Sequence, residues 1–260
     1  MNRVAIVTGA ARGIGAASVD ALVGDGYRVV AVDRCRDVPE VPYALATPAE
    51  LDAVVARHGD AVLGLVGDVR SASDMQLAVE TATRHFGRLD AVIACAGVIA
   101  AGGPLWEISD AAWDAVWSIN VLGIRRLIEA AAPTLIANGP GSNGRIVAVA
   151  SAAGTMGLRH LAAYSAAKHA VVGLIRGVAM DLAEHGITAN CVSPGSTRTA
   201  ILDASADVYG LSSGEEFARQ QPIGRLIEPH EIASTITWLC SPASSAITGA
   251  DVAVDGGMTV

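Results

Sequence analysis

Tyr164 and Lys168 lie four residues apart in an alanine-rich run, Tyr-Ser-Ala-Ala-Lys, whose composition favours a helix. Residues with this spacing share one helix face and are about 6 Å apart along its axis. An ammonium so close to a phenol stabilises the phenolate, so the spacing predicts that Lys168 lowers the pKa of Tyr164. Ser151 follows an apolar run at residues 145–150, which places its hydroxyl at the carboxyl end of an expected strand. Together these groups can move a proton to or from an alcohol oxygen, although an exposed Tyr–Lys pair is also common on helices.

A glycine-rich turn follows the first apolar run of the chain. Gly9, Gly13 and Gly15 have the spacing G-x-x-x-G-x-G between an expected strand at residues 3–8 and an expected helix at residues 14–24. Glycines let the backbone approach a ligand, and the free N–H groups of a helix N-terminus favour an anion. The pattern indicates a pyrophosphate site, and a tight strand-to-helix turn without a ligand is the alternative.

Asp33 ends the next expected strand and stands 18 residues after Gly15. An acid about 20 residues beyond the glycine turn typically binds the adenosine ribose hydroxyls of a dinucleotide. A carboxylate there repels the 2′-phosphate of NADP, so the sequence predicts NAD. Arg12 and Arg34 leave NADP open as an alternative, because an arginine near the ribose can accept that phosphate.

Apolar runs and helical patterns alternate along the whole chain, which predicts a parallel sheet with right-handed crossovers. The expected fold is α/β, a Rossmann-type doubly wound sheet of about seven strands with helices on both faces, and residues 1–260 are expected to form one domain. Expected strands occupy residues 3–8, 27–32, 61–66, 89–94, 145–150, 187–192 and 250–254.

Two segments depart from this alternation. Residues 34–50 contain Pro39 and Pro42 and are expected to form an irregular loop near the cofactor, either a lid or surface decoration. Thr47-Pro48-Ala49-Glu50 is a capping box that predicts the start of a helix. Residues 200–225 are mixed and polar, and we expect them to be a mobile segment that covers the substrate.

The overall composition excludes several classes of protein. The net charge of −8, without a cluster of Lys or Arg, argues against a nucleic-acid partner. The most apolar long segment, residues 161–180, contains Lys168, His169 and Arg176, which argues against a membrane span. Met1 runs almost directly into an apolar strand, so a cytoplasmic location is expected. The cysteines are far apart and lack metal-binding spacing, so no metal is expected; they are Cys35, Cys95, Cys191 and Cys240.

These motifs stand in one order that closely resembles the short-chain dehydrogenase/reductase family over essentially the whole chain. The resemblance is carried by Thr8-Gly9 to Gly15, Asp68-Val69, Ala96-Gly97, Asn120, Ser151, Tyr164-x-x-x-Lys168, Pro194-Gly195 and Asp255-Gly-Gly. It implies that Asn120, Ser151, Tyr164 and Lys168 are the catalytic residues. The dinucleotide contacts that it implies are Gly9, Ala11, Arg12, Gly13, Ile14, Gly15, Asp33, Arg34, Asp68, Val69, Cys95, Ala96, Gly97, Asn120, Tyr164, Lys168, Pro194, Gly195, Thr197 and Thr199.

Two features of the sequence refine the resemblance. Cys95 stands where the family usually has an Asn that braces the central sheet, which puts the local hydrogen bonding in doubt. The loop with Val41-Pro-Tyr-Ala-Leu-Ala-Thr-Pro-Ala-Glu-Leu51 looks like a narrower subgroup, the mycofactocin-coupled oxidoreductases similar to carveol dehydrogenase. In that subgroup the extra loop is thought to bury NAD so that it does not exchange, and electrons leave through mycofactocin, a peptide-derived redox carrier.

The resemblance implies hydride transfer between a secondary alcohol or ketone and NAD. Tyr164 is expected to act as the base, Lys168 to activate it, Ser151 to orient the substrate oxygen, and Asn120 to hold a water. Leu158, Leu161, Ile201 and Leu202 suggest a small apolar alcohol, although they could equally be helix packing. A homotetramer is implied. An ordinary NADP-dependent ketone reductase and a non-catalytic dinucleotide-binding regulator remain as alternatives.

Overall fold

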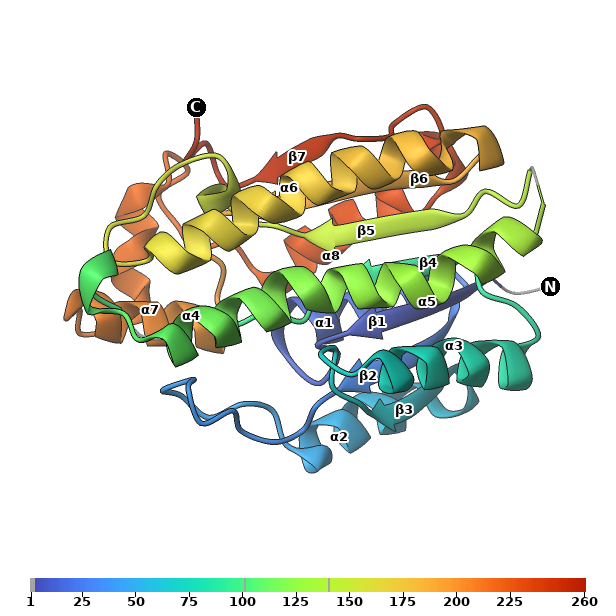
Figure 1. Ribbon diagram of the computed structural model, residues 1–260, viewed down its shortest axis with the longest axis horizontal. Coiled ribbons are helices and arrows are strands. Elements are labelled where there is room, and N and C mark those ends of the chain that lie inside the picture. Colours follow the sequence, from blue (N-terminus) through green and yellow to red (C-terminus); the bar gives the residue numbers. More distant parts are fainter. Residues whose placement is uncertain (1–2, 101, 140) are drawn as a thin grey trace.

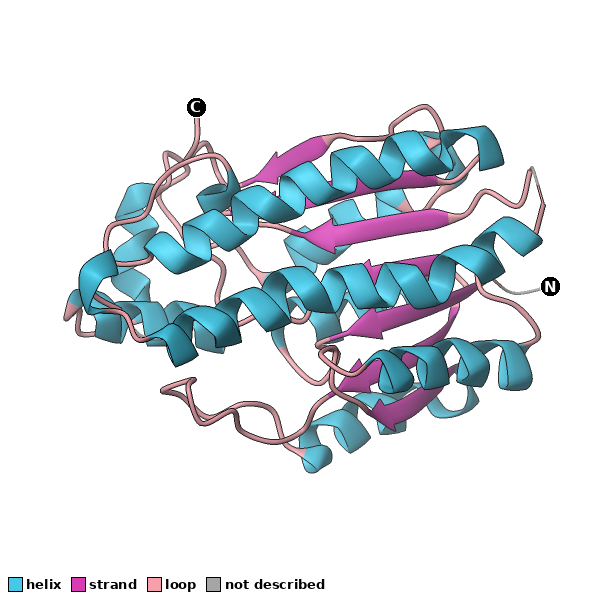
Figure 2. Ribbon diagram, in the orientation of Figure 1, coloured by secondary structure: helices cyan, strands magenta, loops and turns pink. Residues whose placement is uncertain are grey.

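The computed structural model describes residues 3–260 apart from residues 101 and 140. Seven parallel strands form one sheet in the order β3-β2-β1-β4-β5-β6-β7 (Figures 1 and 2). This order and the helices on both faces confirm the predicted Rossmann-type α/β fold. The strands are β1 (Val4–Thr8), β2 (Arg28–Asp33), β3 (Val62–Val66), β4 (Ala91–Ala94), β5 (Arg145–Val149), β6 (Thr188–Pro194) and β7 (Asp251–Val254).

Helices cover the two faces of the sheet in separate groups. The side chains of α1, α2 and α8 share a core with one face, and those of α3, α4, α5 and α6 share a core with the other. The remaining helix, α7, lies beyond the carboxyl ends of the strands. The helices are α1 (Gly13–Gly24), α2 (Pro48–His58), α3 (Ala72–Phe86), α4 (Asp110–Trp117), α5 (Gly123–Ala137), α6 (Ala162–Leu182), α7 (Ala200–Tyr209) and α8 (Pro229–Leu239).

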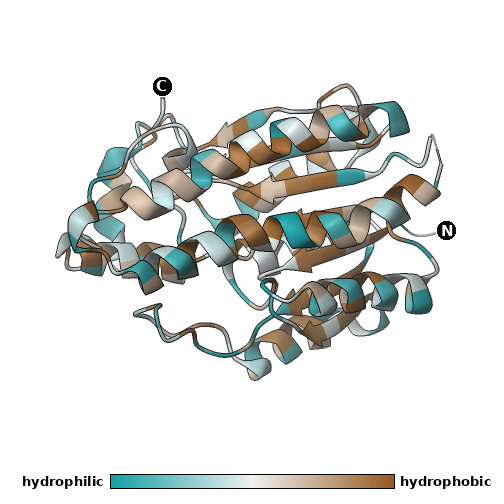
Figure 3. Ribbon diagram, in the orientation of Figure 1, coloured by the Kyte–Doolittle hydropathy of each residue, from teal (hydrophilic) through white to brown (hydrophobic). Residues whose placement is uncertain are grey.

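The central strands are buried on both faces, which explains why they read as continuous apolar runs rather than as alternating ones. Every residue of β1, β4, β5 and β6 is buried. Figure 3 shows hydrophobic colour along these strands and hydrophilic colour scattered over the helices. No helix among the described residues is both long enough and apolar enough to cross a membrane.

The structure corrects the sequence interpretation at three places. Residues 200–225 contain α7 and a 3₁₀ helix at Gly214–Gln220, elements that the mixed composition did not indicate. The helix expected to begin at Ser109 or Asp110 and to carry Asn120 is α4, which continues through a π-helical turn at Ser118–Leu122 into α5, an extension that was not predicted. Strand and helix ends differ from the expected ranges by one or two residues elsewhere, as is usual for element boundaries.

The loop of residues 34–47 is irregular, as predicted, and α2 begins where the capping box predicted. The Thr47 hydroxyl accepts a hydrogen bond from the Glu50 backbone N–H, and the Glu50 carboxylate accepts one from the Thr47 N–H. In Figure 1 this loop is the blue segment that extends from β2 toward the carboxyl edge of the sheet before α2 begins.

Candidate active site

A cavity of about 1010 Å³ lies at the carboxyl edge of the sheet. Its lining comes from the glycine turn, the segments after β2, β3, β4, β5 and β6, the loop of residues 34–47, and α7. Two predicted site residues, Ala11 and Asn120, lie behind this lining. The predicted residues that line it are Gly9, Arg12, Gly13, Ile14, Gly15, Asp33, Arg34, Asp68, Val69, Cys95, Ala96, Gly97, Ser151, Tyr164, Lys168, Pro194, Gly195, Thr197 and Thr199.

The glycine turn between β1 and α1 is too tight for side chains at two of its positions. A Cβ on Gly15 would lie 1.9 Å from the Gly9 carbonyl oxygen, and one on Gly9, whose φ is +67°, would lie 2.8 Å from the backbone of Ala96. Arg12 is the N-cap of α1 without a side-chain cap among the described residues, and the first turn carries no acidic side chain. The N–H groups at this helix end therefore fit an anion such as a pyrophosphate.

Asp33 links the glycine turn to the loop that follows β2. One carboxylate oxygen accepts a hydrogen bond from the Ala11 N–H at 3.0 Å, and the other accepts one from the Cys35 N–H at 3.2 Å. These bonds fix the carboxylate at the cavity wall, where its remaining acceptor capacity suits the hydroxyls of a ribose.

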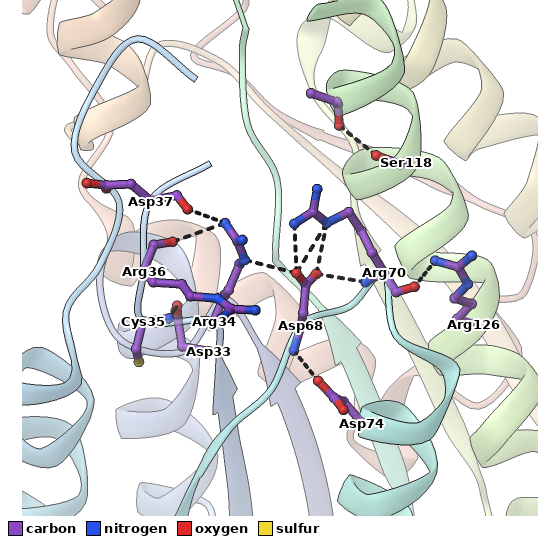
Figure 4. A network of polar contacts seen from close by, with 11 residues as sticks. Asp33, Arg34, Cys35, Arg36, Asp37, Asp68, Arg70, Asp74, Ser118 and Arg126 are labelled. Carbon is purple, nitrogen blue, oxygen red and sulfur yellow. Dashed lines mark hydrogen bonds and ion pairs between the residues drawn. The ribbon is translucent and has the colours of Figure 1, made fainter. Parts of the chain in front are cut away.

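The two arginines that left NADP open are both engaged by other parts of the protein. Arg12 donates from Nη2 to the Ala44 carbonyl at 2.7 Å, so it holds the loop of residues 34–47. The Arg34 guanidinium forms an ion pair with Asp68, with 2.9 Å between Nε and Oδ2 (Figure 4). Both guanidinium groups are thus held by contacts within the protein.

Tyr43 extends from the same loop toward the predicted catalytic residues. Its hydroxyl accepts a hydrogen bond from the Ile99 N–H at 3.3 Å, and its ring belongs to an apolar cluster with Leu161 and Tyr164. Burial raises the pKa of Tyr43 to about 12, so its phenol stays protonated at neutral pH. One loop therefore covers the cofactor side of the cavity and also forms part of its apolar substrate side.

Tyr164 and Lys168 lie one turn apart on α6, as their spacing predicted, but their electrostatics differ from the prediction. Burial raises the pKa of Tyr164, and a hydrogen bond with the Ser151 side chain opposes that rise. Lys168 donates from Nζ to the Val149 carbonyl at 2.8 Å, and its Nζ is 5.5 Å from the centre of the Tyr164 ring. The prediction that Lys168 lowers the Tyr164 pKa is therefore wrong for this structure, because desolvation dominates.

Burial also acts on the ammonium of Lys168, lowering its pKa to about 8. The side chain is 4% exposed and lies against Gly97, where a Cβ would be 3.6 Å from Nζ. Its partner among the described residues is a neutral carbonyl rather than a carboxylate. This is a site where an ammonium is held near a phenol at a substantial desolvation cost.

Asn120 lies in the π-helical turn between α4 and α5 and is fully buried. Its Oδ1 accepts a hydrogen bond from the Val98 N–H and its Nδ2 donates to the Val98 carbonyl, both at 2.8 Å. Both ends of the amide thus brace the chain after β4, which indicates a structural role for this side chain, whereas the resemblance implied that it holds a water. A Cβ on Gly97 would lie 3.0 Å from Oδ1, so this brace also positions Gly97.

The segment after β6 closes over the glycine turn. A Cβ on Gly13 would lie 3.3 Å from the methyl group of Thr199, and Thr197 donates from its hydroxyl to the Gly195 carbonyl at 3.0 Å. A Cβ on Gly195 would lie 2.5 Å from Oε1 of Gln221, so this position cannot carry a side chain without rearrangement. The two predicted dinucleotide segments are therefore adjacent.

Several cavity residues were not singled out from the sequence. The predicted apolar residues Leu158, Leu161, Ile201 and Leu202 all line the cavity, but so do side chains for which no role was inferred. An aromatic residue flanked by prolines in an unusually long loop could have signalled Tyr43. Val38 offers no local signal, since it approaches the cavity only through the tertiary fold. Ile99, Met156, Tyr209 and Phe217 also line the cavity, and they lie within residues 97–106, 152–160 and 201–217, the stretches that the sequence predicts around the substrate.

Among the described residues, no group of three or more His, Cys, Asp or Glu side chains is placed to hold a metal ion. Cys95 lines the cavity, and burial raises the pKa of its thiol to about 12. A thiol with so high a pKa is protonated and unreactive at neutral pH.

Comparisons with known proteins agree with this fold. A family model described as Enoyl-(Acyl carrier protein) reductase matches residues 9–259. The chain is 36% identical to an uncharacterized oxidoreductase of Mycobacterium tuberculosis, covering 98% of this chain and 96% of that protein. It is 38% identical to cis-4-hydroxycyclohexanecarboxylate dehydrogenase of Sinomonas cyclohexanicum, covering 99% and 97%. The crystal structure of carveol dehydrogenase from Mycobacterium avium in complex with NAD is similar with a TM-score of 0.93 and 28% identity, covering 98% and 97%.

The open parallel sheet with its cavity at the carboxyl edge is the architecture of Rossmann-type dinucleotide-binding proteins. The chain belongs to the short-chain dehydrogenase/reductase family.

Proposed function

We propose that the protein transfers a hydride between a small apolar secondary alcohol or its ketone and NAD. The observation that carries the proposal is that Ser151, Tyr164 and Lys168 line the same cavity as the glycine turn. The uncapped N-terminus of α1 and the fixed Asp33 carboxylate fit the pyrophosphate and ribose of such a cofactor. When bound, NAD supplies the hydride acceptor or donor, and the protein supplies position and proton transfer.

Tyr164 holds the proton that the substrate oxygen exchanges. Because burial raises its pKa, the phenol is protonated at neutral pH and is ready to donate to a ketone oxygen. In alcohol oxidation the same phenol must first lose its proton, so oxidation is favoured as the pH rises. Ser151 is oriented by the Ala153 N–H, which donates to its Oγ at 3.1 Å, and this leaves its own O–H free to bond the substrate oxygen or Tyr164.

Lys168 contributes an ammonium beneath the cavity. Its Nζ is anchored by the Val149 carbonyl and lies beside Gly97, which lines the cavity. The apolar side chains of Leu158, Leu161 and Ile201 exclude water from the site and suit an apolar alcohol. Relatives named for a hydroxycyclohexane acid and for carveol support an alicyclic substrate.

We further propose that NAD is retained between turnovers and is re-oxidised by mycofactocin. Three contacts fasten the loop of residues 34–47 to separate elements: Arg12 to Ala44, Tyr43 to Ile99, and Arg34 to Asp68. Because each must open before the loop can swing away, the loop opposes release of a bound dinucleotide. This supports a lid rather than surface decoration.

The purified and dialysed protein should therefore carry NAD, detected by absorbance and by mass analysis of an extract. It should oxidise alicyclic alcohols with an artificial electron acceptor and show little turnover with free NAD alone. A protein that is empty but reduces added NAD freely would refute retention and leave an ordinary dehydrogenase. A protein that binds NAD but oxidises no alcohol and reduces no ketone would be a dinucleotide-binding regulator.

The subunits are proposed to form a homotetramer in the cytoplasm. The outer surfaces of α5 and α6 share a shallow apolar pocket that includes Ile128, Ala132, Leu174 and Val178, and such a surface suits contact between copies. Sedimentation velocity should give the mass of four chains, and a monomer at micromolar concentration would contradict this assembly.

A further inference from the structure

Arg34 and Asp68 form an ion pair at the cavity wall, between the ends of two neighbouring strands (Figure 4). Arg34 follows Asp33 at the end of β2, and Asp68 follows the end of β3. Their side chains are only 19% and 14% exposed, and both residues line the cavity. The pair therefore lies beside the carboxylate that is proposed to bind the adenosine ribose.

The Arg34 guanidinium is held at more than one point. Its Nε lies 2.9 Å from Oδ2 of Asp68, and its Nη1 donates to the carbonyls of Asp37 at 2.5 Å and Arg36 at 3.3 Å. An arginine receives a phosphate best through two parallel N–H donors. Here Nη1 is directed to the start of the loop, and Nε lies against the Asp68 carboxylate.

Asp68 is itself immobilised by a second arginine. Arg70 bonds both carboxylate oxygens from Nε and Nη2, the closest contact being 2.8 Å, and its backbone N–H also donates to Oδ1. The Asp68 N–H donates to the Asp74 carboxylate at 2.9 Å. Although burial alone would raise it, the pKa of Asp68 is lowered by the hydrogen bonds from Arg70 and by the charge of Arg34. The carboxylate is therefore ionised at neutral pH and rigidly placed.

We propose that Asp68 is a positioning residue for cofactor choice: by holding Arg34 it prevents this arginine from accepting the 2′-phosphate of NADP. Discrimination against NADP then has two parts, repulsion by Asp33 and withdrawal of the nearest cation by Asp68. The inference rests on the proposed dinucleotide-binding function and extends it to a residue outside the ribose contact. It explains why an arginine directly after the ribose-binding acid is compatible with NAD.

A double-mutant cycle on the whole protein tests this coupling. Asp33→Ser removes the repulsion, Asp68→Asn keeps the shape but weakens the hold on Arg34, and the third variant carries both changes. NADP and NAD affinities are measured by calorimetry, and the two dinucleotides retained through purification are compared by mass analysis. The double variant should favour NADP by about tenfold or more beyond the product of the two single effects. Each NADP affinity is expressed relative to the NAD affinity of the same variant, and thermal unfolding shows that each variant is folded.

Two further variants separate this mechanism from simpler ones. Adding Arg34→Gln to the double variant should remove the extra NADP affinity, because the proposed phosphate ligand is gone. A double variant with Asp33→Ser and Arg70→Gln should show no extra NADP affinity, since Asp68 still holds Arg34.

Two results of these measurements would contradict the role proposed for Asp68. Additive single effects would overturn the proposal, and so would extra NADP affinity that survives Arg34→Gln, because Asp68 would then act by direct repulsion. Those results leave the proposed hydride transfer untouched, whereas a wild-type protein that binds neither dinucleotide would refute the proposed function itself.

Discussion

Buried polar groups have different partners at the two ends of the strands, which we call the amino edge and the carboxyl edge of the sheet. At the amino edge, Asp90 accepts a hydrogen bond from the Val4 N–H at 2.8 Å and pairs with Arg88, and Tyr27 donates to the Cys240 carbonyl at 2.8 Å. These groups bond to other parts of the protein. At the carboxyl edge, the N–H groups of the glycine turn and the hydroxyls of Ser151 and Tyr164 face a cavity of about 1010 Å³. Polar groups thus stabilise the fold at one edge and remain available to a ligand at the other.

Two buried tyrosines show the contrast within one residue type. Burial raises the pKa of both Tyr27 and Tyr164. The Tyr27 proton is committed to a backbone carbonyl, whereas Tyr164 meets the Ser151 hydroxyl at the cavity. A raised tyrosine pKa therefore indicates a functional site only where the phenol faces a cavity in which a ligand can accept its proton.

The largest expected effect is a loss of turnover when the Tyr164 proton is removed. Tyr164→Phe should lower turnover by about 10²- to 10⁴-fold, because it removes the group that exchanges a proton with the substrate oxygen. NAD binding should persist, because the phenol ring remains in place. Steady-state rates and calorimetric binding measure the two quantities.

The matched control is Tyr27→Phe at the amino edge. It loses one buried hydrogen bond, so the free energy of unfolding should fall by about 1 kcal/mol while turnover stays at the wild-type rate. Wild-type turnover in Tyr164→Phe, or a loss of turnover in Tyr27→Phe with folding intact, would erase the distinction between the two edges.

At the amino edge the largest expected change is in stability. Asp90→Ala leaves Arg88 and the Val4 N–H without their partner, so the free energy of unfolding should fall by about 3 kcal/mol. Urea denaturation measures this loss, and NAD affinity of the folded variant should be unchanged. The exposed Glu80, whose closest contact with Arg84 is 3.8 Å, provides the control, because Glu80→Ala should cost less than about 0.5 kcal/mol. A weakened NAD affinity in Asp90→Ala would mean that the amino edge also serves the site.

Local sequence rules were sufficient wherever the cause of a structure is local. The capping box at Thr47 and Glu50 predicted the start of α2, and the four-residue spacing of Tyr164 and Lys168 predicted a shared helix face. The apolar runs predicted the strands, because a strand buried on both faces has little choice of residue type.

The features that the sequence did not predict depend on contacts between segments far apart in the chain. Nothing near Lys168 indicates that its Nζ turns to the Val149 carbonyl, and nothing near Tyr43 indicates a bond to Ile99. The mixed and polar composition of residues 200–225 gives no sign of α7, because the burial of Ala204 and Ala206 is decided by the clusters around them. The predicted direction of the Tyr164 pKa shift was wrong for the same reason, because the burial of Tyr164 cannot be inferred from its spacing to Lys168.

Lys168 offers a direct measure of the buried charge at the carboxyl edge. It is the single lysine of the chain, so selective ¹⁵N labelling of lysine gives one side-chain resonance. That resonance should titrate with a pKa of about 8 in the protein, because desolvation disfavours the ammonium. A midpoint near 10.5 would show that the ammonium is stabilised by a charge partner.

The same shift predicts how stability depends on pH. Between pH 8 and 10.5 the unfolded chain binds a proton at Lys168 that the folded protein does not, so folding is favoured as the pH rises. Relative to Lys168→Met, the wild-type protein should therefore gain up to about 3 kcal/mol of stability across this range. Thermal unfolding of both proteins at matched pH values measures the difference, and a constant difference would contradict the buried, unpaired charge.

The smallest expected effect concerns how long the carboxyl edge keeps its ligand. Tyr43→Phe removes the hydrogen bond from the Ile99 N–H but keeps the ring in its apolar cluster. Loss of one such bond, worth about 1 kcal/mol, should speed the release of NAD by about fivefold. Tyr209→Phe is matched in chemistry, since the Tyr209 hydroxyl donates to the Arg159 carbonyl at 2.6 Å, but that bond does not involve the loop of residues 34–47. Release followed by exchange with labelled NAD should accelerate in the first variant alone; equal rates would mean that the loop covers the cavity without retaining the cofactor.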